Sequence, residues 1–161
     1  MTTEQVANRF FELSKEGKFD VILNELYSND CVSFEPDYGV EEDLTNANGQ
    51  EAIRLKGQKF NESIEAMHGG YTGEPIIGGT HFSLAIGMDV TMKGRGREKM
   101  DEVCVYEVKD GKIVKEQFFY QDKNCLEIKF RCIMLHQNFI FFINYYSFLI
   151  VHLRLQCPCL R

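Results

Sequence analysis

Four side chains of this sequence could exchange protons in a binding site: Glu35, His68, Glu102 and Tyr120. A carboxyl group in an apolar pocket has its charged form disfavoured, so its pKa rises toward neutral pH. There it can act as an acid or a base, as an imidazole or a phenol can. These four residues are the predicted catalytic set.

Each of the four also has a simpler interpretation. Glu35 could be a solvated glutamate at a strand end, and Glu102 a salt-bridge partner at the rim of a sheet. His68 could close a helix, where an imidazolium complements the negative helix end. Tyr120 could pack along a wall with its hydroxyl at the rim. The sequence leaves both interpretations open.

The histidines and acids do not predict a metal centre. His68, His81 and Asp89 lack the spacing of a closed metal site. His81 begins a strand on the face opposite Phe82, which favours a place at a sheet interface. We therefore expect neither a metal nor another cofactor.

Hydrophobic periodicity predicts three helices in the first 70 residues. Thr2 and Gln5 have capping-box spacing before an apolar stripe that ends at Gly17. A second short helix follows from Phe19 to Leu26. A third helix begins at Gly49, and the pair Gly69 and Gly70 ends it. Its apolar residues fit the helical period: Ile53, Phe60, Ile64 and Met67.

The remaining apolar residues predict strands. Residues 31–34 form a short strand that Pro36 stops, and residues 37–48 read as an acidic, turn-rich loop that could act as a lid. From residue 82 the apolar residues alternate without a miss to residue 92, as in a long strand with one buried face. Two more long strands follow and end near Val108 and Tyr120. The order predicts an α+β fold.

The turn between the last two strands decides which acid shares a face with the aromatic residues. A three-residue loop with a left-handed Gly111 aligns Glu102 with Cys104, Tyr106, Val114, Phe118 and Tyr120. A two-residue turn at Asp110 and Gly111 brings Asp101 to that face instead, because a one-residue slip exchanges the faces. We favour the three-residue loop, since it groups more aromatic residues.

The charge distribution divides the chain. Residues 1–122 hold 23 acidic and 13 basic side chains, a balance of −10, whereas residues 123–161 have a balance of +4. An acidic domain repels phosphate backbones, so we expect no nucleic-acid partner. Cys31 and Cys104 lie in strand-like runs, as buried thiols of a reducing compartment do. The start of the chain lacks a basic, apolar leader, and we expect a cytoplasmic protein.

Residues 123–161 differ in composition from the rest. They contain no Gly or Asp and are dense in Phe, Ile, Asn, Tyr, Lys and Leu, whose codons are rich in A and T. We interpret them as a tail outside the domain: a non-native or read-through end, or a segment that contacts a membrane or a partner. Residues 133–155 are long enough to span a membrane, but polar residues interrupt the segment and would be costly in the hydrocarbon region. A metal or redox motif at Cys157-Pro158-Cys159 is the least favoured alternative.

Three segments carry a resemblance to a known family: FFELSKEGKFDVILNELYSNDCVSFEP (10–36), GQEAI (49–53) and MDEVCVYEVKDGKIVKEQFFY (100–120). They resemble the nuclear transport factor 2-like superfamily, in its SnoaL-like and ketosteroid-isomerase-like branch. The resemblance covers residues 1–122. It implies a cone-shaped, curved antiparallel sheet wrapped against three helices, with an apolar pocket at its open end. It also implies pairs of subunits that associate through their sheets.

The resemblance also implies roles for particular residues. Glu35, immediately before Pro36, takes the position of the proton-shuttling carboxylate of the isomerases. Glu102 falls near the place of their protonated, oxyanion-binding acid, which is a standard example of a raised carboxyl pKa. Their oxyanion-binding tyrosine aligns with Phe10, which has no hydroxyl, so the isomerase chemistry cannot be complete. Tyr120 or Tyr106 could supply a phenol instead.

Two functions follow from these observations. The first is cofactor-independent acid–base chemistry, of isomerase, cyclase or dehydratase type, on a small apolar carbonyl compound. The second is a non-catalytic module that binds a ligand or dimerises. We expect the dimer to form through the outer face of the long strand, at His81, Ser83, Ala85 and Gly87, where few charges stand. Any membrane contact would come from residues 123–161.

Overall fold

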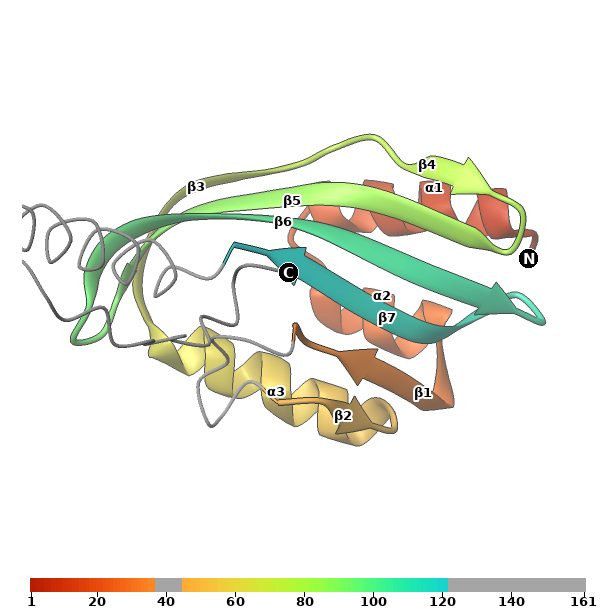
Figure 1. The fold of residues 1–161 in the computed structure, drawn as a ribbon, viewed down its shortest axis with the longest axis horizontal. Coiled ribbons are helices and arrows are strands. Elements are labelled where there is room, and N and C mark those ends of the chain that lie inside the picture. Colours follow the sequence, from red (N-terminus) through yellow and green to blue (C-terminus); the bar gives the residue numbers. More distant parts are fainter. Residues whose placement is uncertain (37–44, 122–161) are drawn as a thin grey trace, which may run out of the picture. The chain divides into compact units, whose positions relative to one another are not determined.

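The computed structural model describes residues 1–36 and 45–121, and Met1–Gln121 forms one compact unit (Figure 1). No helix among these residues is long and apolar enough to cross a membrane. The predictions for residues 123–161, and for residues 37–44 of the expected loop, lie outside the described residues. The elements are α1 (Thr3–Lys15), α2 (Phe19–Leu26), β1 (Tyr27–Phe34), β2 (Ala47–Asn48), α3 (Gln50–Ser63), β3 (Ile64–Thr72), β4 (Ile76–Gly78), β5 (His81–Met92), β6 (Gly96–Lys109) and β7 (Lys112–Tyr120).

The first helix forms as its sequence predicts. The Thr2 side chain accepts a hydrogen bond from the Gln5 backbone, and the Gln5 side chain accepts one from Thr2, which completes the capping box. The apolar stripe of α1 is buried against the sheet through Val6, Phe10 and Leu13. The prediction of a first amphipathic helix is therefore confirmed.

The strands form one curved sheet of mixed direction, in the order β2-β1-β7-β6-β5-β3, with β4 paired to β5 (Figure 1). The long hairpins β5–β6 and β6–β7 are antiparallel. β1 instead runs parallel to β7, with a bulge between Tyr27 and Val32. This pairing joins the first strand of the chain to the last, so residues 33–35 and 116–120 become neighbours.

The core fills the space between the helices and the inner face of the sheet. Phe10 of α1 contacts Phe82 of β5 and Tyr106 of β6, with ring centroids 5.8 and 4.8 Å apart, and the last two rings stack at 4.8 Å. All three are at most 2% exposed. Burial of large aromatic side chains supplies much of the driving force for folding. Phe10 is thus a packing residue, consistent with its lack of a hydroxyl.

The third helix ends earlier than its periodicity predicts. α3 stops at Ser63, and residues 64–72 form strand β3, which pairs antiparallel with β5. Ile64 and Met67 fit a helical period, but pairing with a long strand decides the conformation. His68 therefore lies inside an edge strand and does not close a helix. Gly69 lies in the same strand and does not end α3.

Close contacts between strands explain two glycines of this region. A Cβ added to Gly70 would lie 2.9 Å from the Gly87 carbonyl oxygen, and one added to Gly87 would lie 2.0 Å from the Tyr71 ring. A side chain at either position would push β3 away from β5 or displace that ring. These glycines let the edge strand follow the curved sheet.

The turn between β6 and β7 differs from the favoured prediction, yet Glu102 still shares a face with Cys104, Phe118 and Tyr120, as predicted. Asp110 and Gly111 both have positive φ, 52° and 76°, as a two-residue turn requires. A register shift follows between Glu107 and Val108, opposite residues 113–115. The bulge restores the register that the turn alone would lose. Glu102 therefore pairs with Tyr120, and Cys104 with Phe118.

Candidate functional site

Glu35, Lys56 and Tyr120 form a hydrogen-bonded cluster on the inner side of the sheet. The Lys56 ammonium donates to Glu35 Oε1 at 2.5 Å and to Ser33 Oγ at 2.7 Å. The Tyr120 hydroxyl donates to Glu35 Oε2 at 3.0 Å. Ser33 and Glu35 are two residues apart, so alternation along the chain directs both toward α3. Both oxygens of Glu35 thus accept hydrogen bonds, whereas we expected apolar surroundings for this carboxylate.

Glu102 adds a second carboxyl beside this cluster. It lies directly opposite Tyr120 across the β6–β7 ladder, a position that brings side chains about 5 Å apart at Cβ. The pKa of Glu102 is raised to about 7, chiefly by burial and also by the charges of Glu35 and Glu116, while the Cys104 thiol and Lys56 act to lower it. Cys104 Sγ lies 3.5 Å from Glu102 Oε1.

A third carboxyl, Glu116, lies deeper in the same face and is 3% exposed. It accepts hydrogen bonds from the Tyr27 hydroxyl and from the Ser33 hydroxyl. Burial raises the pKa of Glu116, while these two donors and Lys56 lower it. Burial likewise raises the pKa of the Tyr27 phenol well above its ordinary value, so Tyr27 remains a donor. The three glutamates and Lys56 are here called the inner cluster: Glu35 directly follows β1, and the others come from α3, β6 and β7.

Sequence reasoning missed Lys56 and Glu116. Lys56 follows Ile53 by three positions, on the stripe that α3 turns toward the sheet. Glu116 has the same parity along β7 as Phe118 and Tyr120, so it belongs to the buried face. In both cases the signal in the sequence was a charged residue at a position where the helical or the alternating pattern expects an apolar one.

His68 lies apart from the inner cluster. Its side chain is exposed on β3, and Nε2 lies 2.7 Å from Thr91 Oγ1 of β5. His81 is also exposed, with Nδ1 3.1 Å from Thr80 Oγ1, on the face opposite Phe82 as expected. The structure therefore joins Glu35, Glu102 and Tyr120 of the predicted catalytic set, and it separates His68 from them.

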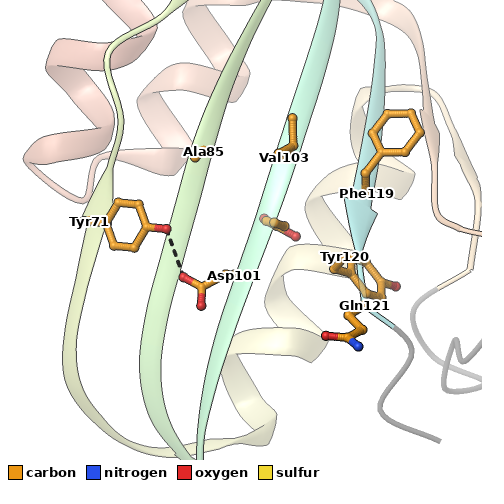
Figure 2. Close-up of a pocket in the computed structure, with 8 residues that line it drawn as sticks. Tyr71, Ala85, Asp101, Val103, Phe119, Tyr120 and Gln121 are labelled. Atoms are coloured by element: carbon orange, nitrogen blue, oxygen red, sulfur yellow. Dashed lines mark hydrogen bonds between the residues drawn. The ribbon is translucent and has the colours of Figure 1, made fainter. Parts of the chain in front are cut away.

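The opposite, outer face of the sheet carries a hollow of about 400 Å³ (Figure 2). Ala85, Val103 and Phe119 are partners across β5, β6 and β7, and they share this face. At its edge the Tyr71 hydroxyl donates to Asp101 Oδ1 at 2.9 Å, as Figure 2 shows. The hollow is lined by Tyr71, Ala85, Asp101, Glu102, Val103, Phe119, Tyr120 and Gln121.

This hollow and the inner cluster are different places. Glu102 and Tyr120 belong to strands that border the hollow, but alternation along these strands directs their side chains to the inner face. Val103 and Phe119 are 47% and 48% exposed on the outer side. The chemistry-bearing groups therefore lie on one face, and the open apolar surface on the other.

The described residues offer no group of three or more histidine, cysteine, aspartate or glutamate side chains arranged to hold a metal ion. Cys31 and Cys104 are free, buried thiols. Burial raises the pKa of Cys31 to about 11 and that of Cys104 still further, so neither is an activated nucleophile. The polar chemistry of the site thus resides in carboxyl, phenol and ammonium groups.

Comparison with known proteins places this geometry in a family. A sequence model of the SnoaL-like domain matches residues 1–120. A protein from Mesorhizobium loti, provisionally assigned as a SnoaL-like polyketide cyclase, is 38% identical, with a TM-score of 0.69. That match covers 74% of this chain and 100% of the other. No curated protein sequence matches the chain.

More distant structures share the fold. An NTF2-like protein of unknown function from Burkholderia pseudomallei K96243 is 16% identical, with a TM-score of 0.63 over 78% of this chain and 95% of the other. TerC, crystallised with polyporic acid, is also 16% identical, with a TM-score of 0.61 over the same shares. These matches, and the match over residues 1–120, confirm the predicted superfamily and fold. The chain belongs to the SnoaL-like domain family.

Proposed function

We propose that this domain binds a small, largely apolar carbonyl compound on the inner face of its sheet and transfers a proton on it without a cofactor. The reaction would be of isomerase, cyclase or dehydratase type, with Glu102 as the proton-transferring group. One observation carries the proposal. Glu102 is a half-buried carboxyl with a pKa raised to about 7, directly opposite Tyr120, whose hydroxyl is bonded to Glu35.

A carboxyl with this pKa has both protonation states populated near neutral pH, which is the condition for efficient acid–base catalysis. The carboxylate can take a proton from the carbon beside a carbonyl, and the C–H electron pair then moves onto the carbonyl oxygen. Returning the proton to another atom of the same molecule completes the transfer, and no second reactant is consumed. Glu35 holds the Tyr120 phenol beside the reacting region.

The charges of the inner cluster favour a neutral ligand. Among the described residues, the Lys56 ammonium is bonded to Glu35, and its charge also acts on Glu102 and Glu116, so three glutamates share this one cation. An anionic ligand would add a further negative charge in partly buried surroundings, which is costly. A neutral carbonyl compound adds none, and a protonated Glu102 can donate a hydrogen bond to its oxygen.

The structural neighbours support a ligand of this kind. The Mesorhizobium loti protein is provisionally assigned as a polyketide cyclase, and TerC was crystallised with polyporic acid. The Mesorhizobium loti protein is 38% identical to this chain, in a match that covers all of the Mesorhizobium loti protein and 74% of this chain. Because the fold hosts many functions, the inner cluster supplies the argument for this chain's chemistry.

Deuterium exchange tests the proposal. A panel of small cyclic ketones in deuterium oxide, followed by proton NMR, measures exchange at the carbons beside the carbonyl. We expect the protein to accelerate exchange of at least one ketone, and Glu102→Gln to reduce the rate by about 100-fold or more. Glu107→Gln, the same change on the outer side of β6, is the control and should leave the rate unchanged. Equal rates in the wild type and Glu102→Gln would contradict the proposal.

The outer hollow favours a second candidate, a non-catalytic module that dimerises. The exposed apolar residues Tyr71, Val103 and Phe119 gather there, and surfaces of this kind commonly mark protein interfaces. If no ketone of the panel exchanges faster with the protein, this candidate becomes the better account. The two candidates use opposite faces, so both can hold in one molecule.

A further inference from the structure

Lys56 lies where α3 meets the end of β1. Its ammonium is bonded to the Ser33 hydroxyl and to the Glu35 carboxylate, and the centroid of the Phe118 ring lies 5.0 Å away. The side chains of Lys56 and Glu35 are only 12% and 9% exposed. At this exposure, solvent ions screen the pair far less than a surface salt bridge. Two hydrogen bonds to the end of β1, at Ser33 and Glu35, fix the ammonium in place.

Titratable groups come from every strand around Lys56. The ammonium is bonded to Glu35, just after β1, and its charge acts on Glu102 of β6 and Glu116 of β7. These glutamates in turn interact with Tyr27 of β1, Cys104 and Tyr106 of β6, and Tyr120 of β7. The positive charge of Lys56 lowers the pKa of both Glu102 and Glu116, and the negative charge of Glu35 raises both. The ion pair therefore exerts two opposing effects on Glu102.

We infer that Lys56 is the positioning residue of the inner cluster: it fixes Glu35, and through Glu35 the Tyr120 phenol, and it is the shared counter-ion of Glu102 and Glu116. The inference rests on the proposed function in assigning Lys56 to the same site. Without the ammonium, Glu102 would hold its proton to higher pH and could no longer accept one near neutrality. Lys56 thus keeps the proton exchange of Glu102 in the working range.

A double-mutant cycle on the full-length protein tests this role, with carbon-13 NMR titration of the Glu102 carboxyl as the readout. Lys56→Met removes the cation and should raise the pKa of Glu102 by on the order of one pH unit. Glu35→Gln removes the opposing charge and should lower it. Because the two effects oppose each other, the double variant should titrate near the wild type.

Two further variants separate charge from structure. Lys56→Arg keeps the charge, and Glu102 should titrate close to its wild-type pKa. Lys59→Met removes an exposed lysine of the same helix and should leave the pKa of Glu102 unchanged. If Lys56→Met alone fails to fold, the double variant and Lys56→Arg still give the comparison.

A Glu102 pKa that stays unchanged or falls in Lys56→Met would overturn the inference. So would a double variant that titrates as Lys56→Met does. The titration needs no substrate, so its result is independent of the ketone exchange experiment. If no ketone exchanges deuterium faster with the protein, but the Glu102 pKa values of the variants change as expected, only the proposed function is contradicted.

Discussion

Glu102 and Tyr120 lie directly opposite each other on β6 and β7, which places a carboxyl and a phenol side by side on the inner face. Their pairing depends on the bulge opposite Glu107 and Val108, because the two-residue turn alone would align Asp101 with Tyr120. The register of one hairpin therefore decides which acid enters the inner cluster.

The raised pKa of Glu102 makes stability depend on pH. The pKa rises from 4.5 to about 7 on folding, so the folded state holds this proton more tightly. This contribution to stability is present below about pH 4.5 and is lost as the pH rises through 7. At one pH unit per 1.36 kcal/mol, the loss amounts to at most about 3 kcal/mol.

Glu102→Gln should remove that dependence, because glutamine does not titrate. Urea unfolding between pH 5 and 8.5 should show a flatter profile for this variant than for the wild type. Glu107→Gln serves as the control and should keep the wild-type slope. Parallel profiles for the wild type and Glu102→Gln would contradict a raised Glu102 pKa.

Tyr27→Phe should destabilise the protein through Glu116. The Tyr27 hydroxyl is the donor that lowers the Glu116 pKa most, and both side chains are buried. Removing the donor leaves a buried carboxyl oxygen unpaired, which costs about 1–3 kcal/mol. The loss should be larger at pH 8.5 than at pH 5.5, because the variant's Glu116 is harder to ionise.

Tyr71→Phe is the matched control for that variant. It also removes a hydroxyl bonded to a carboxylate, at Asp101, but on an exposed side chain. We expect a change within about 0.5 kcal/mol in denaturant unfolding. If both variants lower the free energy of unfolding equally, the burial of Glu116 does not account for the effect of Tyr27→Phe.

Ala85→Arg should interfere with association through the outer face. Ala85 lies in the floor of the hollow, next to Val103, and a charged side chain there opposes apolar contact. We predict a wild-type dimer and a monomeric variant in sedimentation velocity. Glu62→Arg, at an exposed position on α3, should remain dimeric. A wild type that sediments as a monomer at high concentration would rule out this interface.

Truncation after Asp122 should leave a domain that folds by itself. The SnoaL-like match ends at residue 120, and β7 is the last strand of the sheet among the described residues. We expect the truncated chain to melt cooperatively and to be more soluble than the full-length chain. A truncated chain without a cooperative transition would show that residues 123–161 are needed for folding.

Sequence patterns predicted those elements whose signals are local. The capping box of Thr2 and Gln5 and the alternation along β5 are properties of neighbouring residues, and both formed as expected. Ile64 and Met67 fitted a helix only by coincidence of spacing. Met67 is 57% exposed, and pairing with β5 determines the strand.

The inner cluster depended on contacts between distant elements. The parallel pairing of β1 with β7 brings Glu35 to Tyr120, 85 residues later in the chain. No local pattern encodes that pairing or the bond of Lys56 to the other oxygen of Glu35. The resemblance to the isomerases supplied Glu35 and Glu102, whereas Lys56 and Glu116 emerged only from the folded structure.

The pKa of Glu102 in the full-length protein tests the central claim most directly. Carbon-13 NMR titration of the Glu102 carboxyl should give a value of about 7, as its burial beside Glu35 and Glu116 requires. A proton-transferring role at neutral pH follows from that value. A pKa near 4.3, the value of a free glutamate, would contradict the assignment of Glu102 as the acid–base group.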